Sequence, residues 1–178
     1  MRFRAVTIML LCLVASPVLA TPPTGHIRSL DAAMAKTIGA GVAGSPTFAR
    51  IVDGLERSNV IVLIGFTAHL PPSVGGRTAF MTSSGGWRFL RIVIRSRLSE
   101  FQRITMVAHE LHHALEIASS PEVENRRSLE DLYKAIGVSL LCASECFETA
   151  SAIEAANDVG RELRRSSRGH SSPPGVAH

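Results

Sequence analysis

Cysteine is scarce in this chain of 178 residues, which contains three. Cys12 falls in an apolar stretch near the N-terminus, so Cys142 and Cys146 are the two that remain for the rest of the chain. In a regular helix, residues four apart aim their Cβ atoms poorly for a bridge, and a disulfide here requires the backbone to bend. The sequence leaves open whether Cys142 and Cys146 form a disulfide. No thioredoxin-like context accompanies the pair to indicate a redox role.

The sequence also lacks a strong net charge, an internal repeat and a Gly-x-Ser-x-Gly elbow. Its formal charge is +4, and loss of Arg2 and Arg4 with an N-terminal leader lowers it to +2. Such a weak bias does not favour nucleic acid as a partner. Without the elbow, and with no base indicated for the cysteines, serine or cysteine catalysis is poorly supported.

No apolar run reaches the roughly 20 residues that span a bilayer. The longest, Val6 to Val14, follows a basic start and precedes small residues at Val18-Leu19-Ala20. This is the pattern of a cleaved signal peptide over residues 1–20, with the mature chain starting near Thr21. We therefore predict an exported protein, periplasmic or secreted, that keeps no stable membrane anchor after cleavage.

The most informative segment is His109-Glu110-Leu111-His112-His113. It carries the His-Glu-x-x-His pattern, in which two imidazoles one helical turn apart hold zinc and the Glu acts on a water molecule. At 100° per residue, His109 and His113 share one face of a helix, and Glu110 lies roughly 100° round from His109. The pattern predicts His109 and His113 as ligands of Zn²⁺ and Glu110 as the catalytic general base.

Two neighbours of this pattern are expected to stay out of the metal's coordination. His112 points about 100° away from His113, so we interpret it as a surface or packing histidine. Glu116 lies about 10 Å along the helix from His109. We therefore predict that Glu116 supports a ligand or forms a salt bridge.

A catalytic zinc ion requires a third protein ligand and an open position. Ser119 and Glu116 exclude the ligand arrangement of the metzincins. A final helix is expected over residues 144–165, and on it Glu148 falls within a stripe of alanines and other apolar residues. We predict Glu148 as the third ligand and Glu145 as the alternative ligand. The other interpretation of Glu148 is a residue that forms a salt bridge and binds no metal.

The segments Val107–Ile117 and Phe147–Ala152 resemble the zincin metallopeptidases, specifically their gluzincin branch. They are also similar to small exported bacterial proteins known chiefly as predicted metalloproteins. The resemblance, over roughly Trp87 to Arg164, implies His109, His113 and Glu148 as ligands and Glu110 as base. It further implies a peptide or protein substrate bound as an added strand along Thr78–Thr82 or Trp87–Arg95.

These observations predict an exported zinc metallopeptidase. Tyr133 and His69 are the candidates outside the motif and the tail for stabilising the tetrahedral oxyanion. Neither is an obvious oxyanion-stabilising residue, and the domain lacks the bulk that usually forms a deep substrate cleft, which leaves two alternatives. One is a non-catalytic zinc-binding or zincin-like interaction module, and the other is a zinc hydrolase acting on another amide, such as a cell-wall crosslink.

The expected architecture is α+β and zincin-like, with one domain over residues 21–165 and a disordered tail over 166–178. A twisted sheet of about three strands packs on the metal-bearing helix, and the last helix closes the site. The sequence does not indicate an oligomeric state. The predicted helices are His26–Gly41, one beginning at Ser45-Pro46, Leu98–Ile117, Ser128–Ile136 and Ser144–Arg165, and the predicted strands are Asn59–Phe66, Thr78–Thr82 and Trp87–Arg95.

Overall fold

A computed structural model describes residues 25–138 and 148–169 of the chain. The predicted signal peptide (1–20), Cys142, Cys146, the alternative ligand Glu145 and the tail beyond residue 169 lie outside the described residues. Within the described residues, none of the helices combines the length and apolar character needed to cross a bilayer.

The fold is α+β, as predicted, and is built on a four-stranded sheet of order β1-β2-β4-β3. Strands β1 (Ile27–Ser29), β2 (Val60–Thr67) and β4 (Trp87–Arg95) are parallel. Strand β3 (Gly76–Ser84) runs antiparallel to β4 and forms one edge of the sheet; a turn in which Gly85 and Gly86 adopt positive φ connects it to β4. The prediction of about three strands was therefore one short.

The additional strand β1 comes from a segment predicted to be helical. We expected a helix over His26–Gly41, but α1 spans Ala32–Gly44. The Asp31 side chain caps it by accepting a hydrogen bond of 2.7 Å from the Met34 amide. Pairing with β2 outweighs the helical spacing of the apolar residues before this cap, because a tertiary ladder overrides local periodicity.

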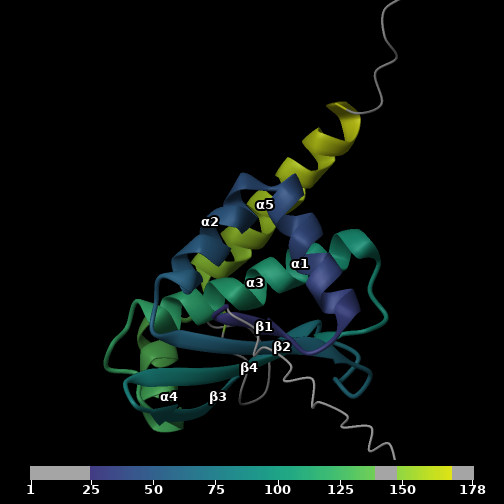
Figure 1. Ribbon diagram of the computed structural model, residues 1–178. Coiled ribbons are helices and arrows are strands. Elements are labelled where there is room, and N and C mark those ends of the chain that lie inside the picture. The colour runs from purple at the N-terminus through teal and green to yellow at the C-terminus, as the bar shows by residue number, and fades with distance from the viewer. Residues whose placement is uncertain (1–24, 139–147, 170–178) are drawn as a thin grey trace, which may run out of the picture.

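The other helices are α2 (Pro46–Glu56), α3 (Glu100–Ala118), α4 (Arg126–Ile136) and α5 (Ala150–Gly169). Figure 1 shows α1, α2, α3 and α5 grouped on one side of the sheet, with α4 apart from them beside β3 and β4. Helix α4 begins before Ser128, where we predicted its start, because Asn125 is its N-cap. Ser128 is the residue that completes the capping box with Asn125. Helix α5 starts later than predicted and continues to Gly169, so residues 166–169 of the predicted tail are helical.

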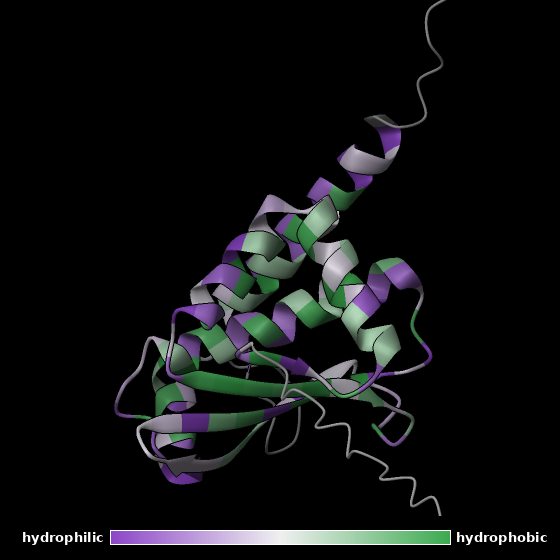
Figure 2. Cartoon of the chain, viewed as in Figure 1, coloured by the Kyte–Doolittle hydropathy of each residue, from purple (hydrophilic) through white to green (hydrophobic). Residues whose placement is uncertain are grey.

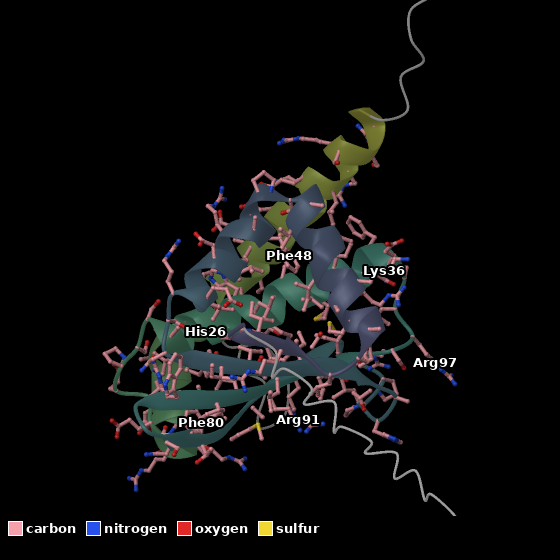
Figure 3. The ribbon with its side chains drawn as sticks, viewed as in Figure 1. His26, Lys36, Phe48, Phe80, Arg91 and Arg97 are labelled. Atoms are coloured by element: carbon pink, nitrogen blue, oxygen red, sulfur yellow. The ribbon has the colours of Figure 1, made fainter. Side chains whose placement is uncertain are left out.

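The core lies between the sheet and the grouped helices. Strand β2 is an almost continuous apolar strand (Figure 2), and its side chains Val60, Val62 and Ile64 are fully buried. On α2, Phe48 packs among the helices (Figure 3). A Cβ on Gly41 of α1 would lie 2.6 Å from the Phe48 ring, so only glycine allows this close packing.

A buried arginine ties the sheet to the end of α3. The Arg88 guanidinium of β4 donates hydrogen bonds to the carbonyl oxygens of Ile117 (2.6 Å), Ala118 (3.1 Å) and Ser120 (2.8 Å). These are carbonyls at a helix C-terminus, which lack partners within the helix and carry partial negative charge. Arg88 thus holds the helix that bears the His-Glu-x-x-His pattern against the sheet.

Replacing Arg88 with Met should lower the free energy of unfolding by about 3 kcal/mol, because several buried carbonyls lose a charged donor. Urea denaturation of the purified protein measures this change. Arg91→Met on the same strand is the matched control, since Arg91 is exposed, and should change stability by less than about 0.5 kcal/mol. Equal losses in the two variants would contradict the capping role of Arg88.

Candidate metal centre

Helix α3 presents the His-Glu-x-x-His pattern from a well-anchored position. Its N-terminus has a capping box in which Ser99 and Gln102 bond each other's backbone groups. Its far end is held by Arg88. Between these ends, His109, Glu110 and His113 are all buried.

The structure brings both histidines and Glu148 together. The Nε2 atom of His113 lies 3.2 Å from Nε2 of His109, which lies 3.1 Å from Oε2 of Glu148. One ligand atom from each of the three lies within 4.8 Å of the others. Residues about a helical turn apart on α3 thus meet a carboxylate from more than 30 positions downstream.

These distances fit a zinc ion. Tetrahedral zinc with bonds of about 2.0 Å holds its ligand atoms about 3.3 Å apart. The separations of His109 from His113 and from Glu148 are close to this value, and the third pair lies within 4.8 Å. Two imidazole nitrogens and one carboxylate oxygen also form the kind of donor set that leaves a fourth position open in catalytic sites. The donor chemistry therefore suits Zn²⁺.

The charges of this cluster support one another. Burial alone would lower the pKa of His109, but hydrogen bonding to Glu148 and the nearby Glu110 carboxylate raise it overall. Burial opposes ionisation of Glu148, yet its contact with His109 lowers the pKa of this carboxyl below the ordinary value. Glu148 is therefore a carboxylate at neutral pH, as a metal ligand must be.

Glu148 does not lie within the last helix, where we expected it. It precedes α5 and pairs with Val138 in an isolated antiparallel bridge, in which the Val138 amide donates to the Glu148 carbonyl at 2.8 Å. Thr149 then caps α5, with its hydroxyl accepting from the Ala152 amide at 3.1 Å. Glu148 thus comes from an extended residue fixed on both sides, rather than from the alanine stripe of the helix.

Glu116 links the two parts of the site. Its carboxylate accepts a hydrogen bond from Nδ1 of His113 at 2.8 Å, and others from the hydroxyls of Thr149 (2.5 Å) and Ser151 (2.6 Å). Burial opposes its charge, but these bonds lower the pKa of Glu116 to about 2. An ionised Glu116 can only accept, so Nδ1 of His113 carries the proton and Nε2 keeps its lone pair for a metal. The supporting role predicted for Glu116 is in keeping with this geometry.

Glu110 lies against the edge strand rather than against the metal ligands. Its Oε2 accepts a hydrogen bond of 2.7 Å from the hydroxyl of Thr78 in β3. A Cβ on Gly76 would lie 2.6 Å from Oε1 of Glu110, so a glycine is required where this carboxylate meets the strand. Burial raises the pKa of Glu110 above its usual range.

The remaining candidates separate clearly. His112 is not part of the group of converging ligand atoms. Its Nε2 lies 3.8 Å from Oε1 of Glu116, and burial lowers the pKa of its imidazole. Tyr133 of α4 lies beside the site, with its ring 5.5 Å from the His113 ring in an edge-on arrangement. His69 is in the loop after β2, outside the cavity around the cluster.

A cavity of about 760 Å³ opens over His109, Glu110, His113 and Glu148. Its walls come from β3 with the preceding loop and from α4, which contributes Leu129, Glu130 and Tyr133 among others.

The sequence did not indicate the residues that position the two supporting carboxylates. Thr78 and Gly76 position Glu110, and Thr149 and Ser151 position Glu116. Thr149 alone carried a signal, as a capping residue directly after the predicted ligand.

The fold and this cluster define a small α+β protein with a candidate His-His-Glu metal centre beside the edge of a sheet. Comparison with protein-family models, with curated proteins and with solved structures finds no significant match. What the centre does is therefore argued from the residues of this chain.

Removing the predicted third ligand should release the metal. Glu148→Ala, purified in the presence of zinc and dialysed, should lose the stoichiometric zinc that the unchanged protein retains, as measured by elemental analysis. Glu154→Ala on α5 is the control, because Glu154 is exposed. Retention of one zinc per chain by Glu148→Ala would show that the third ligand lies elsewhere.

Glu116→Gln should weaken zinc binding about 10- to 100-fold, because the amide no longer fixes the tautomer and orientation of His113. Competition with a zinc-binding dye measures the dissociation constant. The same titration on His112→Gln should give the affinity of the unchanged protein, since His112 lies outside the group of ligand atoms formed by His109, His113 and Glu148. Unchanged affinity in Glu116→Gln would contradict the positioning role.

Proposed function

We propose that this protein is an exported, zinc-dependent metallopeptidase of the zincin type. The observation that carries the proposal is the convergence of the His109, His113 and Glu148 ligand atoms in a cavity that also contains the Glu110 carboxylate. Bound zinc would supply Lewis acidity, which polarises a carbonyl group and brings the pKa of a water molecule toward 7.

Glu110 is suited to act as the general base. Burial raises the pKa of this carboxyl above its usual range, which makes the carboxylate a stronger base. The Thr78 hydroxyl donates a hydrogen bond to Oε2 of Glu110 and so fixes the orientation of the carboxylate. Glu110 takes a proton from the attacking water and later delivers it to the leaving amine.

The edge of β3 supports a peptide as the substrate. The Arg95 amide donates to the Gly75 carbonyl at 2.8 Å, which makes these two residues a hydrogen-bonded pair. Such pairs alternate along an antiparallel ladder, so the main-chain groups of Gly76 and Thr78 point away from β4. An extended peptide can pair with these groups as an added strand, and its backbone then passes Glu110.

Tyr133 is the best-placed group for the oxyanion. It lines the cavity beside His113, and burial raises the pKa of its phenol well above the ordinary value. The phenol therefore stays protonated at neutral pH. Its hydroxyl lies 3.5 Å from the His113 carbonyl oxygen, so it would have to turn from that contact to donate to an oxyanion. His69 lies outside the cavity, which leaves Tyr133 as the stronger of the two candidates from the sequence.

The alternative is a non-catalytic zinc-binding or zincin-like interaction module. One observation favours it: Glu110 is only 5% exposed and is held by Thr78, as a purely structural carboxylate would be. In such a module, zinc would contribute to stability alone. Replacing Glu110 would then leave every assay unchanged.

Glu110→Gln separates the two functions. The variant should keep one zinc per chain but lose at least about a hundredfold in turnover of a quenched fluorescent peptide library, because it cannot accept the proton. Glu130→Gln is the control, since Glu130 lines the same cavity from α4, and it should retain activity. Equal turnover by Glu110→Gln and the unchanged protein would refute the mechanism.

A further inference from the structure

Apolar side chains line the cavity on the side of Glu110 that faces the start of β3. A Cβ on Gly75 would lie 2.5 Å from the terminal methyl carbon of Met106, whereas a Cβ on Gly76 would meet the Glu110 side chain. Glu110 also contacts Thr78, further along the strand. Met106 therefore precedes Glu110 in the direction of β3. The apolar residues that line this end of the cavity, which we call the Met106 pocket, are Pro71, Val74 and Met106.

A second apolar group lies beyond Glu110 in the direction of β3. Thr78 and Phe80 are partly buried between exposed neighbours, so their side chains leave the same side of the strand. Past Phe80, the Ser83 hydroxyl donates to the Glu124 carbonyl at 2.8 Å, which places the start of α4 beside this end of β3. The apolar residues that line this end of the cavity, which we call the Phe80 pocket, are Phe80, Leu129 and Tyr133.

The charged side chains of the cavity wall already have partners. On α4, Nε of Arg126 lies 3.3 Å from the Glu130 carboxylate, and Nζ of Lys134 lies 3.1 Å from the Asp131 carboxylate. Arg77 of β3 also has an interaction partner. Opposite charges at these distances offset each other before a ligand enters. The two apolar pockets therefore decide which side chains fit the cavity.

We propose that the site takes extended segments of unfolded protein chains, with large apolar side chains on both sides of the bond at Glu110. This inference rests on the proposed function, because it requires a peptide paired with β3. Such a peptide directs alternate side chains, about 7 Å apart, toward the cavity. Gly76 and Phe80 are four residues apart on one side of β3, so two apolar residues four apart in the peptide can enter both pockets. Folded proteins bury most side chains of this kind, whereas unfolded chains expose them.

Peptide binding to zinc-loaded Glu110→Gln tests the inference without turnover. Fluorescence anisotropy of a labelled peptide of Ser and Thr residues measures the dissociation constant. Two Leu residues placed four positions apart should strengthen binding at least about tenfold, because both side chains enter apolar pockets. With the Leu residues three positions apart, binding should be at least about threefold weaker than this, because one side chain then points away from the cavity. Equal affinity for the two spacings, or for Glu in place of Leu, would overturn the inference.

Variants of the two pockets assign the gain to its source. In the Glu110→Gln background, Phe80→Ala and Met106→Ala should each lower the affinity for the four-apart peptide to that for a peptide with one Leu. Each should keep one zinc per chain, because neither residue supplies a ligand atom. Ile153→Ala is the control, since it removes an exposed apolar side chain of α5 outside the cavity, and should bind as before. Undiminished affinity in both pocket variants would contradict the assignment.

Turnover by the unchanged protein separates this inference from the proposed function. Cleavage of the four-apart peptide between its Leu residues, at least about tenfold faster than any cleavage of the Ser and Thr peptide, would support both. Equal turnover of the two peptides would overturn the inference and leave the peptidase in place. Leu-dependent binding without turnover would support the pockets and refute the peptidase. Neither binding nor turnover of any of these peptides would overturn both.

Discussion

The candidate metal centre depends on one largely buried carboxylate, that of Glu116, whose side chain is 10% exposed. The two histidines come from a regular helix, but the third ligand comes from a separate segment that precedes α5. Glu116 accepts from His113 on one side and from Thr149 and Ser151 on the other, and thereby fixes that segment relative to α3. Because Thr149 directly follows Glu148, the same carboxylate orients one ligand and places another. A buried charge with several charge-assisted hydrogen bonds is stable where an unpaired one is not.

The second constraint is the close contact between α3 and the edge strand. Glu110 can approach β3 only because Gly76 has no side chain, and it is oriented because Thr78 has a hydroxyl. The strand that positions the candidate base is also the strand whose outer main-chain groups remain open to a partner. In the proposed peptidase, the helix would supply the acid–base group and the strand would align a peptide with it. Arg88 of the neighbouring strand β4 holds the end of α3 against the same sheet.

The sequence predicted the parts of this structure that arise from local patterns. The strand Trp87–Arg95 and the Ser45-Pro46 helix start follow from periodicity and capping. Glu148 was predicted as the partner of the two histidines and lies close to them, but the reason for that prediction, a place in the apolar stripe of the last helix, was wrong. The sequence-based prediction failed where a distant partner decides the conformation. The segment around Ile27 became a strand because β2 was available to pair with it. The position of Glu148 before α5, and the contacts of Glu116 and Thr78, depend on side chains more than 30 residues away, which no local pattern encodes.

Charge is divided between the two sides of the sheet, and this division bears on how the parts work together. Carboxylates are confined to the helices and loops, and three of them meet near the candidate centre on the helical side. The strands carry arginines only, and those that point outward lie among exposed apolar residues. A sheet without carboxylates cannot neutralise these arginines from within, so their partners must be backbone carbonyls, as for Arg95, or groups from outside the strands. Strand β3 brings its Thr78 hydroxyl to the helical side of the sheet, where this polar group orients the Glu110 carboxylate and so links the sheet directly to the candidate centre.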